Sequence, residues 1–260
     1  MKLKFKILSS IFFLGLLGFG VLINSQKATS KPNFNYQIYA PQNITTLGQQ
    51  VQKAQKDSQI IFIVDFSNSM NEQLMGKTKL DMARATLAEI LPKIPPNVKT
   101  GLRVYGYSAG FTYFQGCQSS KLTVPLAQGN YQNILSSLYQ TQATGWTPIT
   151  YSLKQCVNSD FMGTTGKKHI ILLTDGGENC DESPCTYVIN LMKTRDDITI
   201  DVIAFDIHDT DANNQLRCTA LMTSGKYLKA DNENDLYNSL FESVGINKDV
   251  KGNIKIPSEN

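Results

Sequence analysis

The stretch that decides the fold is QIIFIVDFSNSM, residues 59–70. Its first half, Ile60–Val64, is continuously apolar and rich in β-branched residues, which is typical of a central parallel strand buried on both faces. The strand ends in DFSNS, which places Asp65, Ser67 and Ser69 in a row at its carboxyl end. In open α/β sheets, ligands bind outside the carboxyl ends of the strands. This stretch therefore predicts a buried strand that opens directly into a binding loop.

Two later segments offer oxygen ligands of the same kind. A second apolar run, His169–Thr174, ends in Asp175, and Thr147 lies between the two runs in the sequence GWTPI. All these side chains are hydroxyls or carboxylates, so a bound ion should be hard, with Mg²⁺ first, Mn²⁺ or Ca²⁺ next, and zinc disfavoured. Each residue alone also fits a helix cap or a turn. The metal-site interpretation depends on the whole set.

The trio Asp65-x-Ser67-x-Ser69, then Thr147 before a proline, then Asp175 before a glycine resembles the metal-ion-dependent adhesion site (MIDAS) of the von Willebrand factor A (VWA) domain, in the same chain order. Five matching residues in order are a stronger signal than one short motif. The resemblance implies that Ser67 and Ser69 bind the ion directly and Thr147 directly or through water. It implies that Asp65 and Asp175 hold coordinating waters or ligate in turn. It further implies that a protein partner donates a Glu or Asp carboxylate to the ion.

Strand-like and helical patterns alternate along the rest of the chain. Because Pro125 cannot donate to a strand ladder, the strand that contains it should be short and at an edge. The alternation implies βαβ units with right-handed crossovers. The predicted fold is α/β, a doubly wound, Rossmann-like, mostly parallel sheet with helices on both faces and one short antiparallel edge strand. Strands are expected at 60–65, 102–107, 122–126, 170–174, 198–205 and 227–230, and helices at 78–91, 131–139, 185–193, 212–222 and 234–244, with a further helix starting after Pro148.

The two ends of the chain differ from this pattern. Lysines within residues 1–6 precede an apolar run, so residues 1–25 are predicted to be a signal peptide or an N-terminal membrane anchor. Residues 26–56 are expected to be a polar linker, 57–246 the VWA-like domain and 247–260 a flexible tail. The domain should therefore be exported, whether secreted, periplasmic or on the cell surface. Contact with a membrane is expected only through the N-terminal segment.

The chain has five cysteines, and in an oxidising compartment an odd number leaves one thiol unpaired. Cys156 lies among apolar helical residues and is the expected buried free thiol. A local bridge between Cys180 and Cys185 would stiffen the loop after Asp175, but the sequence leaves the pairing among these two, Cys117 and Cys218 open. A zinc site built from cysteines is disfavoured because the usual closely spaced pairs are missing.

Charge and motifs exclude several functions. The formal net charge is +3 and no arginine-rich face is visible, which argues against nucleic-acid binding. Asp65 resembles the nucleophile of haloacid-dehalogenase-like phosphatases, but Ser67 stands where those enzymes carry a second Asp. Only His169 and His208 could serve a Ser-His-Asp hydrolase. There is no Gly-x-Ser-x-Gly elbow and no phosphate loop.

The sequence thus predicts a binding module rather than an enzyme, one that engages an acidic protein ligand through its metal ion. The alternatives are a structural module of an envelope complex with a non-essential metal site, and a metal-dependent hydrolase. Trp146 is either a contact for the partner or a core residue packed over its loop. The group Asp206, His208, Asp209 and Asp211 is either a second ion site or, as we favour, a set of solvated loop charges. His169 is expected to be structural.

Overall fold

The computed structural model describes residues 58–245. The predicted export segment, polar linker and tail fall outside these residues. Within the part of the chain that the structure describes, no helix is long and apolar enough to cross a membrane.

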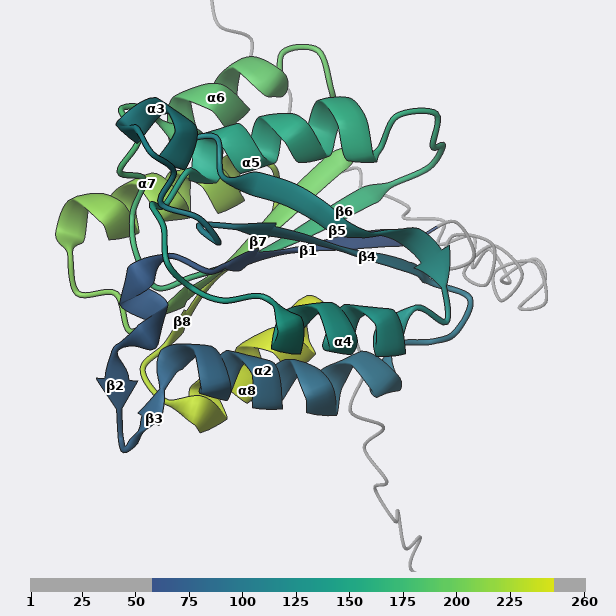
Figure 1. Cartoon of the computed structure of the whole chain (residues 1–260). Helices are drawn as coiled ribbons and strands as arrows, with labels where there is room; N and C mark the ends of the chain where they lie inside the picture. The colour runs from purple at the N-terminus through teal and green to yellow at the C-terminus, as the bar shows by residue number, and fades with distance from the viewer. Residues whose placement is uncertain (1–57, 246–260) are drawn as a thin grey trace, which may run out of the picture. The chain divides into compact units, whose positions relative to one another are not determined.

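Six strands form one mixed sheet in the order β5-β4-β1-β6-β7-β8 (Figure 1). Neighbouring strands are parallel except for the antiparallel pair β4 and β5. The strand order reverses at β1, because the chain adds β4 on one side of it and β6 on the other. The carboxyl end of β1 is therefore the switch point at which such sheets bind ligands. The strands are β1 Gln59–Asp65, β4 Lys99–Tyr105, β5 Ser120–Gln128, β6 Lys168–Thr174, β7 Ile198–Phe205 and β8 Tyr227–Ala230.

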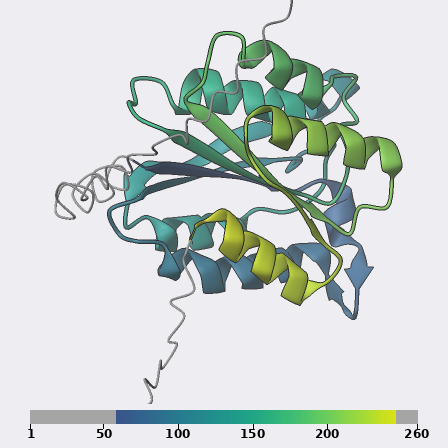
Figure 2. The same cartoon turned by 180° about the vertical axis from the view of Figure 1, so that it is seen from behind.

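Helices cover both faces of the sheet, as Figures 1 and 2 show from opposite sides. Side chains of β1 alternate between the two cores: Phe62 and Val64 join the cluster under α2, α4 and α8, whereas Ile61 and Ile63 join the cluster under α5, α6 and α7. Both faces of β1 are buried, which explains its unbroken apolar sequence. One face carries α2 Lys79–Ile90, α4 Tyr131–Gln140 and α8 Glu233–Ser243, and the other α5 Ile149–Gln155, α6 Pro184–Leu191 and α7 Thr210–Met222.

The predicted fold class is confirmed, with local differences. The edge strand β5 has nine residues rather than five, and its register against β4 shifts on both sides of Leu102, close to Pro125. Proline has no N–H to donate to the strand ladder, and a bulge allows the strand to tolerate the missing hydrogen bond. The strand β4 ends at Tyr105, two residues before the predicted end. The hairpin of β2 Gln73–Leu74 and β3 Lys77–Thr78 and the short helix α3 Tyr113–Gly116 were not predicted.

Candidate metal centre

The structure brings the five predicted site residues to the carboxyl edge of the sheet. Asp65 ends β1, Asp175 follows β6, the two serines lie after β1, and Thr147 lies just before α5. Ser67 Oγ is 3.0 Å from Ser69 Oγ, and Ser69 Oγ donates a hydrogen bond to Asp175 Oδ1 at 2.7 Å. Thr147 lines the same cavity of about 390 Å³ as Ser67 and Ser69. Residues far apart in sequence thus share one site, and all of them except Ser69 are buried.

A glycine after β4 allows the loops of the site to meet. Gly106 has a φ of +73°, and a Cβ there would lie 2.6 Å from both the Ser67 nitrogen and the Trp146 carbonyl oxygen. The two loops are joined beside it, because Ser67 and Gly145 form a parallel bridge and the Asn68 N–H donates to the Gly145 carbonyl at 3.0 Å. A side chain at position 106 would separate the serine loop from the loop that carries Thr147.

Asp65 holds the serine loop through its carboxylate. Oδ1 accepts a hydrogen bond from the Ser67 N–H at 2.6 Å, and Oδ2 accepts from the hydroxyls of Tyr105 at 2.9 Å and Thr174 at 2.8 Å. Burial raises the pKa of Asp65 to about 7 and the neighbouring Asp175 raises it too, whereas the hydrogen bonds from Ser67 and Thr174 oppose the rise. Asp65 therefore positions Ser67 within the site.

A buried cation, Lys79, also lies at the site, and the sequence reasoning missed it. Its Nζ is 3.2 Å from Asp175 Oδ2, 3.2 Å from Asp206 Oδ2 and 2.9 Å from Glu72 Oε2. Burial lowers the pKa of Lys79, but Glu72, Asp175 and Asp206 together raise it above its usual value. Burial also raises the pKa of Asp175, against the effects of Ser69 and Lys79. A lysine in the first turn of a helix opposes the helix dipole, and that was the signal that could have revealed it.

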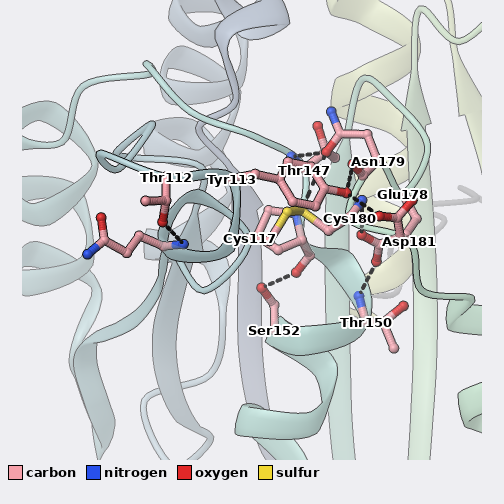
Figure 3. The surroundings of a disulfide bond; sticks show 12 residues. Thr112, Tyr113, Cys117, Thr147, Thr150, Ser152, Glu178, Asn179, Cys180 and Asp181 are labelled. Carbon is pink, nitrogen blue, oxygen red and sulfur yellow. Dashed lines mark hydrogen bonds between the residues drawn. A yellow bond between two sulfur atoms is a disulfide. The ribbon is translucent and has the colours of Figure 1, made fainter.

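The loop after β6 positions Thr147 (Figure 3). Asn179 Oδ1 accepts a hydrogen bond from the Thr147 N–H at 2.7 Å. The Glu178 carboxylate accepts from the N–H groups of Thr150 at 2.7 Å and Cys180 at 3.0 Å. Glu178 thereby satisfies a donor that the start of α5 would otherwise leave unpaired, and burial raises its pKa. Sequence reasoning missed Glu178 and Asn179, although both closely follow Asp175.

The four paired cysteines form the disulfides Cys117–Cys180 and Cys185–Cys218, and Cys156 is a buried free thiol, as predicted. The sequence left this pairing open, and the local bridge between Cys180 and Cys185 that it allowed does not form. Cys180 is bonded to the β4–β5 connection, whereas Cys185 on α6 is bonded to α7. Disulfides persist in oxidising compartments, so the two bonds indicate an extracytoplasmic protein.

The acidic group after β7 makes contacts within the protein. Within residues 58–245, no three His, Cys, Asp or Glu side chains are grouped as metal ligands. Asp209 caps α7 by accepting a hydrogen bond from the Ala212 N–H, and Asp206 contacts His208 as well as Lys79. His169 lies in β6 with its Nε2 3.1 Å from Asp201, in the expected structural role.

The fold and this edge of the sheet define the class: a doubly wound α/β domain whose loops gather hydroxyl and carboxylate oxygens at the switch point. Residues 59–242 match the family model of the von Willebrand factor type A domain. The chain belongs to this family.

Known proteins resemble the chain at moderate to low identity. It is 28% identical to YwmC of Bacillus subtilis (strain 168) over 188 residues, which cover 71% of this chain and 82% of that protein. Proximal thread matrix protein 1 from the mussel byssus, with a zinc-occupied MIDAS motif, is 18% identical with a TM-score of 0.54 over 72% of this chain and 44% of that one. Pilus adhesin SpaC from Lactobacillus rhamnosus GG is 16% identical with a TM-score of 0.56 over 72% of this chain and 30% of that one. This chain spans less than half of either structure, and the two likenesses show the fold alone.

Proposed function

We propose that this protein is an extracytoplasmic binding module that engages a protein partner through a divalent cation at a MIDAS. The ion would be held by Ser67, Ser69 and Thr147 together with Asp65 and Asp175, and the partner would donate a Glu or Asp carboxylate. One observation carries the proposal: Ser69 Oγ lies 3.0 Å from Ser67 Oγ and 2.7 Å from Asp175 Oδ1, so hydroxyl and carboxylate oxygens from two loops are already adjacent.

The spacing of these oxygens fits Mg²⁺. Adjacent ligands of an octahedral ion with metal–oxygen bonds of about 2.0–2.1 Å lie about 2.9 Å apart, which compares with the separations of 3.0 and 2.7 Å in the site. Ca²⁺ takes about six to eight oxygens at about 2.3–2.6 Å in a flexible geometry, so these separations also allow Ca²⁺. Without an ion, the same oxygens hydrogen-bond to one another. Mg²⁺ is therefore the first ion to test, followed by Mn²⁺, Ca²⁺ and the zinc of the mussel protein.

The donor set would leave much of the ion's charge uncompensated. Ser67, Ser69 and Thr147 offer neutral hydroxyls, and Asp175 is partly neutralised by the Lys79 ammonium at 3.2 Å. A divalent cation with so few anionic protein ligands attracts a carboxylate from outside. This charge balance supports an acidic side chain as the partner's contribution.

Binding is favoured over catalysis. Both histidines of the chain contact aspartates, His169 with Asp201 and His208 with Asp206. Neither contact supplies the nucleophile and base pair that a hydrolase needs. Ser67 also occupies the place of the second acid that a haloacid-dehalogenase-like phosphatase requires. We therefore propose a non-enzymatic role.

Metal titration tests the site directly. We expect calorimetry and thermal-shift measurements to detect Mg²⁺ and Mn²⁺ binding to the wild-type protein. Ser67→Ala together with Ser69→Ala should abolish that binding, because two ligands are lost. The matched control is Ser136→Ala with Ser137→Ala on α4, which should bind the ions normally. A wild-type protein that shows no response to any of the ions would contradict the proposed function.

Partner capture from an envelope extract separates the binding module from a purely structural module. We expect the captured partner to be lost when a chelator removes the ion and to return when Mg²⁺ is restored. A partner that stays bound in the chelator would favour a structural module whose metal site is not essential.

A further inference from the structure

Four aromatic side chains lie on the two loops that border the site cavity. Phe111, Tyr113 and Phe114 belong to the β4–β5 connection and Trp146 directly precedes Thr147; we call these four residues the aromatic rim. Their exposed fractions are 100% for Phe111, 69% for Phe114, 44% for Tyr113 and 39% for Trp146. Single exposed aromatic residues are common, but a group of them beside a binding site is typical of an interaction surface.

Tyr113 of the aromatic rim is held by the loop after β6, and Figure 3 shows it beside Asn179 and Asp181. The Tyr113 ring packs edge-on against Trp146 with centroids 5.2 Å apart, and its hydroxyl lies 2.9 Å from Asp181 Oδ2. The Cys117–Cys180 disulfide joins the same two loops. A surface that is already ordered loses little conformational entropy when a partner binds. These contacts hold the connection on which the exposed Phe111 and Phe114 lie.

The cavity is lined by one residue of the aromatic rim, Trp146, together with three of the proposed metal ligands, Ser67, Ser69 and Thr147. It has a volume of about 390 Å³, and Ala109 of the β4–β5 connection lines it as well. Successive residues of an extended chain are about 3.3 Å apart. A partner segment with a carboxylate at the ion would therefore bring a residue one or two positions away to the cavity and the rim.

The charges near the rim restrict the partner further. Asp181 contacts Tyr113, and Glu178 and Asp175 lie in the same part of the site. A segment with many acidic residues would be repelled by these carboxylates. One carboxylate next to an apolar side chain fits both the cation and its surroundings.

We propose that the aromatic rim and the cavity bind an aromatic side chain of the partner, placed one or two residues from the carboxylate that reaches the ion. This inference rests on the proposed function, and it adds the second determinant of the partner's recognition sequence. The partner segment would thus combine one acidic residue with one nearby aromatic residue.

The single tryptophan of the chain provides the measurement, because Trp146 is itself part of the rim. The full-length protein, purified in detergent and saturated with Mg²⁺, would be titrated with the capped peptides Gly-Phe-Gly-Glu-Gly and Gly-Glu-Gly-Phe-Gly while tryptophan fluorescence is followed. Matched peptides carry Ala in place of Phe, or Gln in place of Glu. We expect the better Phe peptide to bind at least about tenfold more tightly than its Ala counterpart. The Gln peptides should not bind.

Substitutions in the rim test the same point from the side of the protein. Phe111→Ser with Phe114→Ser should weaken binding of the Phe peptide about tenfold and leave Mg²⁺ affinity unchanged. The control is Met162→Ser with Leu221→Ser, two apolar residues that are 75% and 59% exposed away from the rim. This control should change neither affinity.

The outcomes separate this inference from the function on which it rests. If Mg²⁺ binds but the Phe and Ala peptides bind equally, or neither binds, the inference is overturned and the metal site stands. Full peptide affinity in the Phe111 and Phe114 variant also overturns the inference. A protein that does not bind Mg²⁺ overturns both proposals.

Discussion

Lys79 is the residue on which the charge balance of the site depends. Its side chain is 6% exposed and that of its partner Asp175 is 0% exposed, so the pair is buried, whereas the Glu72 side chain is 65% exposed. Breaking a buried ion pair from one side leaves an uncompensated charge, whereas an exposed pair contributes little.

We expect Lys79→Met to lower the free energy of unfolding by about 3 kcal/mol in a chelator. Added Mg²⁺ should recover more stability in this variant than it adds to the wild type, because the ion then supplies the missing positive charge beside Asp175. Urea denaturation with and without Mg²⁺ measures both effects. Lys77→Met, which removes an exposed pair with Glu233, is the control and should change stability little. Equal gains from Mg²⁺ in the wild type and Lys79→Met would contradict the role given to Lys79.

Asp65 should make the stability of the ion-free protein depend on pH. Its pKa in the folded protein, about 7, exceeds its ordinary value of 3.8. The folded state therefore binds more protons than the unfolded chain between these values, and stability should fall as the pH rises from about 4 to about 7. In a chelator, we expect the free energy of unfolding to be lower at pH 8 than at pH 5, on the order of 2–4 kcal/mol.

Asp65→Asn should reduce this difference, because an amide does not titrate, and urea denaturation at the two pH values measures it. The Mg²⁺ affinity of the wild type should change in the opposite direction and be higher at pH 8, since the ion favours the ionised carboxylate. If the stability of the wild type does not change between pH 5 and pH 8, burial does not raise the pKa of Asp65 as described.

The site residues differ in how visible they were in the sequence. Asp65, Ser67 and Ser69 have a fixed spacing from the end of an apolar strand, so their place at the sheet edge follows from local pattern. Lys79 acts through its contact with Asp175, which is 96 positions away. Tyr105 acts through its contact with Asp65, which is 40 positions away. No local pattern encodes such contacts, because they depend on which strands become neighbours.

Among the elements, the loop after β6 has the widest influence on the site. It carries Asn179, which accepts a hydrogen bond from Thr147, and Cys180, which is bonded to the loop of the aromatic rim. The other disulfide joins Cys185 on α6 to Cys218 on α7, and none of the proposed ligands belongs to these two helices. The chain thus contains its own comparison between a disulfide near the site and one outside it.

We expect Cys117→Ser with Cys180→Ser to weaken Mg²⁺ binding, because Asn179 would hold Thr147 less firmly. Cys185→Ser with Cys218→Ser should leave Mg²⁺ affinity unchanged. Both variants should lose stability, by about 4 kcal/mol at most in the chain-entropy description, since the two bonds span 63 and 33 residues. Calorimetry and urea denaturation test the pair. Equal Mg²⁺ affinity in the two variants would show that the Cys117–Cys180 disulfide does not support the metal site.

Elements with a local sequence pattern were predictable, and those that depend on distant contacts were not. The strand β7 lies at its predicted position because a run rich in apolar and β-branched residues is bounded by polar turns, and the four-residue strand β8 also lies where it was predicted. The helix α3 has four residues and shows no periodicity of its own. Its conformation depends on the disulfide and on Trp146, which come from distant parts of the chain. The disulfide pairing could not be predicted for the same reason, because each bond joins cysteines from different elements of the fold.

At the scale of the described domain, the position of the site follows from topology. The alternating strands and helices predict a parallel sheet, and β1 at its centre places Asp65 where the strand order reverses. The fold class and the edge that carries the site could therefore be predicted together. The aromatic rim could not, because its surface depends on how the β4–β5 connection packs against two other loops.

Cys156 lies in the core between α5 and the sheet, where burial raises the pKa of its thiol and keeps it unreactive. The other four cysteines are in disulfides, so a thiol-specific reagent has one target, Cys156, which it reaches only when this layer opens. The rate at which a maleimide labels Cys156 in the native protein therefore reports how often α5 separates from the sheet. A ligand that binds at the metal centre and makes this opening rarer would slow the labelling of Cys156. The native thiol would then report ligand binding without an introduced probe.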